Sequence, residues 1–346
     1  MMRVGIIGVT GYTGSELLRL LFLHKNVEIT YVTSYSFAGK TLAEIHPHYL
    51  DIIEPVLHSF SVEEAAEKTD LVFSALPHGK SMEVVPQLCA AGLKVIDLSA
   101  DFRLLDAALY PQWYKREHSA PQYLEKAVYG LPELYKEKIK KASLVANPGC
   151  YPTAVILALA PLAARKIVDW DTLIADAKSG TSGAGRTPSQ ALHYAECTEN
   201  FRAYRVAEHQ HTPEMEQELG RLAGQKISFT FVPHLLPMIR GILSTIYTGL
   251  NVETTEEEIR NVYREFYRNE SFVRILPSPF LPETRNVYAS NYCDLSVKWD
   301  PRKNRLIIIS AIDNLVKGAA GQAVQNMNLM LGFKEEEGLK AIPLRP

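Results

Sequence analysis

The sequence predicts an α/β protein with two domains: a doubly wound parallel sheet of the Rossmann type, and an α+β domain whose sheet is mixed or antiparallel. The length of 346 residues suggests two domains. In the first half, short apolar runs alternate with helical segments, which is the order found in parallel sheets. In the second half, longer β runs joined by turns replace that alternation. We expect residues 1–148 and 315–346 to form the first domain and residues 149–314 the second.

Short apolar runs in the first half predict strands, and the residues that follow them are candidates for ligand contact. The runs lie at 3–7, 27–34, 70–76, 94–100 and 144–146, with helices at 15–24 and 80–91. Residues 104–142 are less regular and predict a short helix, a loop and an excursion. Ligands bind at the carboxyl ends of the strands in such sheets. Polar side chains expected at those ends are Ser74, His78, Ser99, Asp101 and Arg103.

The second half predicts a sheet with helices on one face. We expect strands at 172–178, 226–233, 241–250, 292–299 and 305–311, and helices at 153–164, 212–222 and 255–268. Thr212 is the expected N-cap of the middle helix, with Pro213 as its first residue. A helix of small residues, which opens at 313 and runs to 331, can pack closely under a cofactor. The C-terminal segment is therefore expected to return to the first domain.

Composition excludes several classes of function. The net charge is −2, from 37 basic and 39 acidic side chains, which gives no support for binding nucleic acid or an acidic membrane. No run approaches the roughly 18 apolar residues of a membrane span, and no signal peptide is expected. The 4 cysteines are dispersed without CxxC spacing, so a metal site is not expected. These features predict a cytoplasmic enzyme in a reducing compartment.

A glycine-rich turn follows the first strand and precedes a helix. Its residues are Gly8, Thr10, Gly11, Tyr12, Thr13 and Gly14. Glycines in this context let the backbone approach a pyrophosphate at the helix N-terminus, which predicts a dinucleotide site. The spacing is GxxGxxG rather than GxGxxG, and an ordinary glycine-rich turn is the alternative.

The end of the second strand favours NADP over NAD. An NAD site usually places Asp or Glu there, whereas this chain has Ser34 and Ser36, with Lys40 close behind. Hydroxyls and a cation can hold the 2′-phosphate that a carboxylate would repel. The alternative is that both serines are only turn residues.

Cys150 is the candidate nucleophile. It follows the break Asn147-Pro148-Gly149, and Pro152 indicates that a helix begins at or just after it. A helix N-terminus stabilises a thiolate by roughly 1 kcal/mol, up to about 2 kcal/mol when partly buried. That is about one unit of thiol pKa, because each unit is about 1.4 kcal/mol. The helix alone therefore leaves the thiol mixed at neutral pH, and we expect a nearby protonated histidine to complete the activation.

Two histidines in the second half are candidates for acid–base work. His209 and His211 are two residues apart, so on an extended chain they would point to opposite sides, and at most one would face the site. A His-x-His metal site lacks carboxylate partners at helical spacing and is the weaker alternative.

Several basic or hydroxyl side chains are candidates for binding an anionic substrate. The loop 179–186 is dense in glycine and hydroxyls, with Lys178 and Arg186 flanking it; it fits an anion contact or a flexible lid. Arg103 fits either a bidentate grip on an anion or a salt bridge to a nearby aspartate. Arg240 can pair with a substrate carboxylate.

A dinucleotide site, a cysteine at a helix start and a later histidine together suggest chemistry through a thioester. In that chemistry a thiolate displaces phosphate from an acyl phosphate, a hydride from NADPH reduces the thioester, and the product is an aldehyde. A histidine acts as general acid and base, and backbone N–H groups stabilise the oxyanion.

At this level the sequence resembles the N-acetyl-gamma-glutamyl-phosphate reductase family, and the resemblance spans nearly the whole chain. Six motifs carry it, in order: Gly8–Gly14, Leu98–Arg103, Asn147–Thr153, Ser179–Gly185, His209–Glu214 and Asp313–Gly318. The resemblance implies an NADPH-dependent reductase of arginine biosynthesis that converts N-acetyl-glutamyl 5-phosphate to N-acetyl-glutamate 5-semialdehyde and phosphate. It also implies a homo-oligomer, a tetramer or a dimer, with the second-domain sheet as the interface.

The resemblance also implies roles for individual residues. Cys150 matches the nucleophile and His209 the acid–base residue, with His211 as second choice for that role. The cofactor set is Gly8, Thr10, Gly11, Tyr12, Thr13, Gly14, Ser34, Ser36, Lys40, Pro77, His78, Ser182, Asn314 and Lys317. The substrate set is Arg103, Asn147, Ser179, Ser182, His211 and Arg240.

Three rival functions remain open at this stage. The nearest is a sister reductase acting on aspartyl phosphate or on a carrier-bound aminoadipyl phosphate, because the sequence gives no direct view of pocket length. A cysteine hydrolase or acyltransferase would leave the glycine turn unexplained. A non-enzymatic NADP sensor would leave the cysteine and histidine unexplained.

Overall fold

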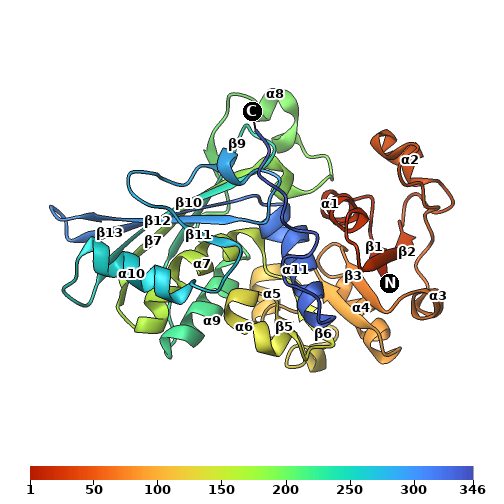
Figure 1. The fold of residues 1–346 in the computed structure, drawn as a ribbon, viewed down its shortest axis with the longest axis horizontal. Coiled ribbons are helices and arrows are strands. Elements are labelled where there is room, and N and C mark those ends of the chain that lie inside the picture. The colour runs from red at the N-terminus through yellow and green to blue at the C-terminus, as the bar shows by residue number, and fades with distance from the viewer. Residues whose placement is uncertain (346) are drawn as a thin grey trace. The chain divides into compact units, whose positions relative to one another are not determined.

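The computed structural model describes residues 1–345. The chain forms two compact units. One unit contains Met1–Pro148 and Ala319–Lys340, and the other contains Gly149–Gly318 and the residues from Ala341 onward. Each unit is built on its own sheet (Figure 1).

The first unit is a parallel sheet of six strands in the order β2-β1-β3-β4-β6-β5. Every pair of neighbours is parallel. The predicted doubly wound fold class is therefore confirmed. The strands are β1 Met2–Ile7, β2 Val27–Thr33, β3 Leu71–Ser74, β4 Lys94–Asp97, β5 Val128–Tyr129 and β6 Leu144–Ala146.

Helices connect these strands and cover the sheet (Figure 1). The first helix, α1, begins at Tyr12 rather than at the predicted Ser15, because Gly11 already has the extended backbone of an N-cap. Leu17, Leu18 and Leu21 form its buried face. The helices are α1 Tyr12–Phe22, α2 Leu42–Ile45, α3 Val62–Lys68, α4 Ser81–Ala90, α5 Leu109–Tyr114, α6 Pro132–Ile139 and α11 Gly321–Met330, with 3-10 turns η1 Pro47–Tyr49 and η2 Pro121–Tyr123.

The strand order reverses between β1 and β3, because β1 pairs with β2 on one side and with β3 on the other. The loops after these two strands meet at Gly8, where a Cβ would lie 2.7 Å from the carbonyl oxygen of Ala75. Gly8 also has a φ of 87°, which disfavours any other residue. In open α/β sheets a ligand binds at such a reversal, outside the carboxyl ends of the strands.

The second unit has a sheet of seven strands in the order β11-β12-β13-β10-β7-β9-β8. The pairs β11–β12 and β7–β9 are parallel and the other pairs are antiparallel, which confirms the predicted mixed sheet. The strands are β7 Val168–Gly180, β8 Arg202–Ala203, β9 Thr230–Leu236, β10 Ile242–Leu250, β11 Val273–Ile275, β12 Cys293–Asp300 and β13 Arg305–Ile312.

A long buried helix supports this sheet. Helix α7, Cys150–Arg165, packs against four of its strands and against helices α9 and α10 (Figure 1). The other face of the sheet carries half-exposed side chains in alternation. The remaining helical elements are α8 Tyr194–Cys197, α9 Thr212–Ala223 and α10 Glu256–Phe266, the 3-10 turns η3 Thr181–Ala184, η4 Gln190–Leu192 and η5 Thr284–Val287, and the π-helical turn η6 Val316–Ala320.

Pro161 lies inside α7 and cannot donate to the carbonyl oxygen of Leu157. The hydroxyl of Tyr267, the C-cap of α10, donates to that oxygen at 2.6 Å, and Tyr263 on α10 donates to Ala158 O at 2.5 Å. Two phenols thus satisfy carbonyl groups at the proline, which lets α7 continue as one helix.

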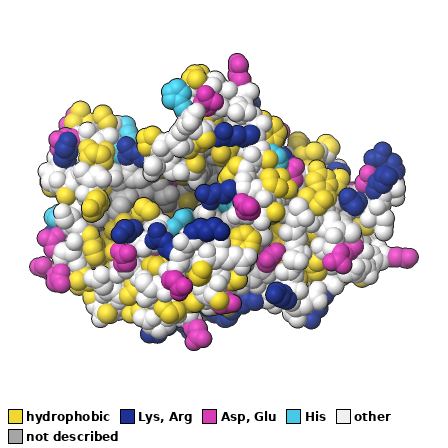
Figure 2. All heavy atoms as spheres, turned by 180° about the vertical axis from the view of Figure 1, so that it is seen from behind, with side chains coloured by type: hydrophobic (Ala, Val, Ile, Leu, Met, Phe, Trp, Pro, Cys, Tyr) yellow, Lys and Arg dark blue, Asp and Glu magenta, His cyan; other side chains and the backbone are white. Residues whose placement is uncertain are grey.

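Several boundaries in the second unit differ from the sequence prediction; strand β7, for example, begins at Val168, four residues before the predicted start at Thr172. Strand β9 begins at Thr230, four residues after the predicted start at Lys226. Helix α9 has His211 as its N-cap and Thr212 as its first helical residue, so the predicted Thr212 cap was wrong by one position. Within the described residues 1–345, no helix has the length and apolar character needed to cross a membrane. Figure 2 shows side chains of both charges interspersed over one face of the molecule.

Candidate functional site

The glycine turn of the first unit leaves the N-terminus of α1 open. No side chain caps this helix, so its first N–H groups are available to an anion. Gly14 must lack a side chain, because a Cβ would lie 2.4 Å from Gly8 O and 2.7 Å from Val9 Cα. A Cβ on Gly11 would meet only Gly8 O, at 3.7 Å, so the space above it is free. This cradle fits the pyrophosphate of a dinucleotide.

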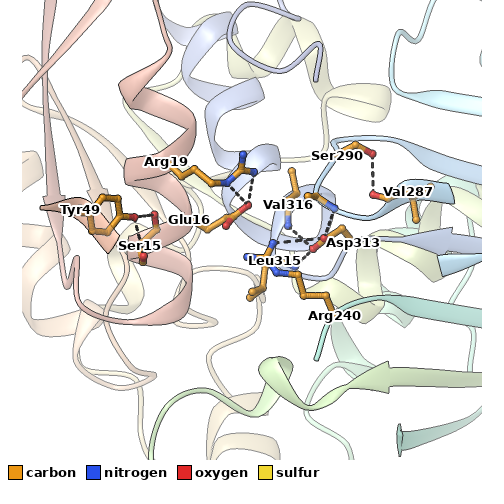
Figure 3. A network of polar contacts seen from close by, with 11 residues as sticks. Ser15, Glu16, Arg19, Tyr49, Arg240, Val287, Ser290, Asp313, Leu315 and Val316 are labelled. Carbon is orange, nitrogen blue, oxygen red and sulfur yellow. Dashed lines mark hydrogen bonds and ion pairs between the residues drawn. The ribbon is translucent and has the colours of Figure 1, made fainter. Parts of the chain in front are cut away.

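The far end of that cradle is built by β2. Ser34 is 3% exposed, and its Oγ lies 3.2 Å from Thr10 Oγ1, so the end of β2 is tied to the glycine turn. Ser36 and Lys40 are exposed, and residues 33–40 contain no carboxylate. Tyr49 anchors the following insertion by donating to Ser15 O at 2.8 Å (Figure 3).

The loops after β3 and β4 are joined by hydrogen bonds. The carboxylate of Asp101 accepts the N–H groups of Gly79 at 2.8 Å and Met82 at 3.0 Å, and burial raises the pKa of this acid. His78 Nδ1 accepts the N–H of Ala100 at 2.9 Å. Pro77 and His78 remain exposed at the carboxyl end of β3, on the same edge of the sheet as the glycine turn.

Arg103 and Asn147 bond to groups within the first unit. Arg103 is 5% exposed and donates from Nε to Asn147 O at 2.7 Å and from Nη2 to Leu98 O at 2.9 Å. The Asn147 amide donates to Ala319 O at 3.1 Å and accepts from Asn326 Nδ2 at 3.0 Å. These bonds fasten the carboxyl ends of β4 and β6 and hold the segment that leads to Cys150.

Cys150 is the first residue of α7, as predicted, and it is half-buried. The preceding amide, that of Gly149, donates to the buried carboxylate of Glu214 at 2.9 Å. Gly318 lies directly against the cysteine, since a Cβ there would be 2.8 Å from Cys150 Cβ and 3.2 Å from its Cα. All 4 cysteines lie within residues 1–345 and are thiols rather than disulfides.

His209 and His211 lie on the same side, and the predicted opposite orientation is wrong. Their ring centroids are 4.8 Å apart, and both contact the ring of Tyr151, at 5.5 Å and 6.1 Å. The chain turns at these residues instead of extending, and the N–H of His211 donates to His209 Nδ1 at 3.1 Å. Both imidazoles are therefore held beside the residue that follows the thiol.

His209 does not provide the positive charge that the sequence led us to expect beside the thiol. Its side chain is 5% exposed, and burial, with a smaller contribution from Arg205, lowers the pKa of the imidazole to about 3. The ring is neutral at physiological pH. The group that can stabilise a thiolate at Cys150 is then the N-terminus of α7, where Cys150 is the first residue.

A second polar cluster lies where β7 and β13 end and β10 begins. Asn314 donates to Ser182 Oγ at 2.9 Å and accepts the N–H of Gly241 at 2.7 Å. Ser179 is 1% exposed, and its hydroxyl donates to Gly180 O at 3.0 Å. This cluster fixes the loop that follows β7 against the loop that precedes β10.

Asp313 organises the turn that brings Gly318 to the thiol. Its carboxylate accepts the N–H groups of Leu315 at 2.8 Å and Val316 at 3.2 Å, and it lies 3.6 Å from Arg240 Nη1 (Figure 3). Lys317 is fully buried, with Nζ 5.7 Å from the centroid of Phe272. Arg240 thus joins the polar framework of the second unit through Asp313.

Comparison with known proteins decides the family. Residues 3–142 match semialdehyde dehydrogenase, NAD binding domain, and residues 150–314 match semialdehyde dehydrogenase, dimerisation domain. The N-acetyl-gamma-glutamyl-phosphate reductase of Desulforamulus reducens is 53% identical over 100% of both chains. That of Pelotomaculum thermopropionicum is 51% identical over 100% of this chain and 99% of its own. The chain belongs to the N-acetyl-gamma-glutamyl-phosphate reductase family.

Solved structures share the fold of this N-acetyl-gamma-glutamyl-phosphate reductase family member at low identity. Aspartate semialdehyde dehydrogenase II of Vibrio cholerae, complexed with ASA, has a TM-score of 0.72 and 17% identity, covering 96% of this chain and 98% of that one. The Candida albicans enzyme with NADP has a TM-score of 0.71 and 17% identity, over 96% and 98%. Membership of the reductase family makes the chain an oxidoreductase with a nicotinamide dinucleotide domain.

Three groups beside the thiol of this N-acetyl-gamma-glutamyl-phosphate reductase family member were not predicted as site residues. Tyr151 and Tyr204 bond to each other through their hydroxyls at 3.2 Å, and burial, with a smaller contribution from Cys150, raises the pKa of both phenols. Glu214 accepts the amide that precedes the thiol. A carboxylate in the first turn of a predicted helix was visible in the sequence, but it indicates only a favourable helix dipole. Nothing in the sequence signals the bond between the two tyrosines.

Proposed function

We propose that this chain reduces N-acetyl-gamma-glutamyl phosphate to the corresponding semialdehyde, with NADPH and through a thioester on Cys150, as a step of arginine biosynthesis. The observation that carries the proposal is the thiol at the first residue of α7, in a chain about half identical to named reductases over its full length. Two histidines pack against the ring of the next residue, Tyr151. Acyl transfer to sulfur needs a thiolate, an oxyanion site and proton handling, and this group of residues offers all three.

In the first step the thiolate sulfur of Cys150 bonds to the acyl carbon, and the carbon–oxygen bond to phosphate breaks. Phosphate leaves with that electron pair. The N–H groups of the first turn of α7 point toward the oxyanion, where charge develops. We assign hydrogen-bond donation or proton exchange at that oxygen to His209 or His211, whose rings contact Tyr151.

NADPH, when bound, supplies the hydride that reduces the acyl carbon of the thioester. The chain's own residues then complete the reaction. The carbonyl oxygen takes up a proton as the hydride adds, and it loses that proton when the carbon–sulfur bond breaks. The products are the aldehyde and the thiolate of Cys150, ready for another cycle.

The cofactor assignment rests on the cradle at Gly8–Gly14 and on the residues at the end of β2. Ser34 and Ser36 with Lys40 offer two hydroxyls and a cation to a 2′-phosphate. Pro77 and His78 lie at the adjacent strand end, and Ser182, Asn314 and Lys317 belong to the motifs implied for the nicotinamide side. We expect kcat/KM to be much higher with NADPH than with NADH, and equal values would refute this assignment.

The substrate contacts proposed are Arg103, Asn147, Ser179, Ser182, His211 and Arg240. Arg103 and Asn147 also bond to main-chain groups, so in the proposal they shape the loop before the thiol as well as contacting the substrate. Phosphate-dependent oxidation of N-acetyl-glutamate semialdehyde with NADP, compared with aspartate semialdehyde, tests the substrate. A larger kcat/KM with the aspartate compound would favour the sister reductase.

We also propose that two copies associate through the free face of the second unit's sheet. That face carries half-exposed apolar side chains in alternation: Leu243 and Tyr247 on β10, Ile307 and Ile309 on β13, and Ile174 on β7, which is 39% exposed. A charged residue in place of Ile309 should shift the protein toward monomer in light scattering. An unchanged mass would place the interface elsewhere.

A further inference from the structure

Arg116, which the sequence did not single out, lies at the carboxyl edge of the first unit's sheet. Its guanidinium occupies the place that a side chain on Gly79 would take. A Cβ on Gly79 would lie 1.3 Å from Arg116 Nη1 and 2.2 Å from its Cζ. The guanidinium therefore rests on the backbone of the loop that follows β3, and only a glycine at position 79 leaves room for it.

The segment that carries Arg116 is anchored on both sides. Before it, the hydroxyl of Tyr110 donates to the main-chain oxygen of Asp101 at 2.7 Å. After it, His118 Nε2 lies 2.6 Å from the same oxygen. Helix α5 ends between these anchors at Lys115, whose φ of 58° turns the chain sharply. Arg116 is thus presented by a turn whose two ends are fixed to the loop after β4.

No acidic side chain pairs with this arginine. Arg116 is exposed, and within residues 1–345 it donates no hydrogen bond and forms no ion pair. Its charge reaches the buried carboxylate of Asp101. That carboxylate already accepts the N–H of Gly79 at 2.8 Å and the N–H of Met82 at 3.0 Å. The donors of the guanidinium therefore remain available to an anionic ligand.

The strand order indicates which part of a dinucleotide passes this point. The pyrophosphate binds at the glycine turn after β1, and the adenosine half lies toward the end of β2. Strand β3 pairs with β1 on the side opposite β2, and β4 lies beyond β3. The loops after β3 and β4, which the bond from Gly79 to Asp101 joins, therefore border the nicotinamide half.

We propose that Arg116 binds the phosphate on the nicotinamide side of the cofactor's pyrophosphate, and that Gly79 lacks a side chain so that the guanidinium can take this position. The inference rests on the proposed NADPH cofactor and adds one residue to its contacts. The uncapped N–H groups of α1 offer hydrogen bonds to the pyrophosphate but carry no full charge. Arg116 adds a full positive charge and a planar fork that matches two phosphate oxygens.

Isothermal titration calorimetry of the full-length protein tests this contact with two ligands, NADPH and adenosine 2′,5′-bisphosphate. The bisphosphate keeps the adenosine half and its phosphates but lacks the nicotinamide-side phosphate. In Arg116→Gln we expect the Kd for NADPH to rise roughly tenfold and that for the bisphosphate to change by about twofold or less, because one charge-assisted contact is lost only with NADPH. Equal weakening of both ligands, or an unchanged Kd for NADPH, would overturn the proposal.

Two further variants separate the guanidinium from local charge. Arg116→Lys keeps the charge but not the fork, so its Kd for NADPH should lie between those of wild type and Arg116→Gln. Lys115→Gln is the matched control, because it removes an exposed cation one residue earlier, whose Nζ donates to Gln112 O at 2.9 Å. It should leave both Kd values unchanged. A loss in Lys115→Gln as large as in Arg116→Gln would mean that only net charge matters, and it would overturn the proposal.

The binding measurement requires no turnover, so failure of the thioester chemistry would not alter it. Wild-type protein that binds neither ligand would refute the proposed cofactor, whereas wild-type binding that Arg116→Gln leaves intact would refute this inference alone. In turnover, Arg116→Gln should raise the KM for NADPH and leave the KM for the acyl phosphate unchanged. The reverse pattern would assign Arg116 to the substrate and overturn the proposal.

Discussion

Gly318→Ala is the substitution whose effect on the thiol can be worked out most directly. The new methyl carbon would lie 2.8 Å from Cys150 Cβ, 3.2 Å from its Cα and 3.3 Å from Ile312 Cδ1. Ordinary contacts of this kind begin near 3.4 Å, so the first is short by about 0.6 Å. Neither partner at the closest contact is the far end of a flexible side chain, and the start of α7 must therefore move.

A displacement of that size should affect catalysis more than folding. Overpacking typically costs about 1–3 kcal/mol of unfolding free energy. In a protein above 150 residues, each kcal/mol lowers Tm by roughly 2–4 °C. A reacting group misplaced by about 1 Å can cost about a hundredfold in rate. We expect a loss of roughly tenfold to a hundredfold in kcat with a modest loss of Tm.

The assay is NADPH consumption together with the rate of Cys150 alkylation by iodoacetamide. A displaced thiol should change both, while NADPH binding measured by fluorescence stays near wild type. Wild-type kcat and an unchanged alkylation rate in a folded Gly318→Ala protein would refute the reasoning, because they would mean that the turn yields without moving the cysteine.

Three further predictions concern other positions. Gly14→Ala should prevent dinucleotide binding or folding, because its methyl would lie 2.4 Å from a carbonyl oxygen. Gly11→Ala, whose methyl meets only Gly8 O at 3.7 Å, should fold normally and raise only the KM for NADPH. Normal NADPH binding by both variants would place the cofactor elsewhere. Glu214→Ala should lose about 1–3 kcal/mol of unfolding free energy, because it leaves a buried amide unpaired, and Glu214→Gln, which keeps an acceptor, should lose less; equal losses in urea denaturation would contradict this. Burial and the nearby Asp101 raise the pKa of Asp97 from 3.8 to about 6. Between pH 6 and pH 4 the folded protein therefore binds a proton at Asp97 that the unfolded chain does not bind. As the pH falls through this range, the free energy of unfolding increases. Asp97→Asn should therefore be most stabilising relative to wild type above pH 6 and lose that advantage toward pH 4, and a difference independent of pH would refute the assignment.

The sequence predicted those parts of the site that depend on local chain geometry. The glycine turn at Gly8–Gly14 and the start of α7 at Cys150 are local because glycine spacing and Pro152 determine the backbone there. The alternation of strands and helices predicted the first sheet, and the long β runs of the second half predicted the second. The glycine turn therefore precedes a helix, and Cys150 begins one, as the sequence predicted.

Features that depend on distant contacts were not predictable. Tyr151 and Tyr204 are 53 positions apart and meet because the segment after β8 continues its pairing onto β9, where Tyr204 N–H bonds Pro233 O at 3.1 Å. His209 and His211 lie on one side because the chain turns at the N-cap of α9, where the N–H of His211 donates to His209 Nδ1. The two-residue spacing in the sequence does not reveal this turn. Burial of His209 likewise depends on rings supplied by other segments, and it reversed the expected charge.

The central claim is that the acyl group is carried on the sulfur of Cys150, and acid-quench mass spectrometry tests it most directly. The protein is mixed with N-acetyl-gamma-glutamyl phosphate without NADPH, quenched and digested. We expect one N-acetyl-glutamyl group on the peptide that contains Cys150, discharged when NADPH is added before the quench. An adduct on another residue, no adduct at all when NADPH is left out, or full reductase activity in Cys150→Ser would contradict the account.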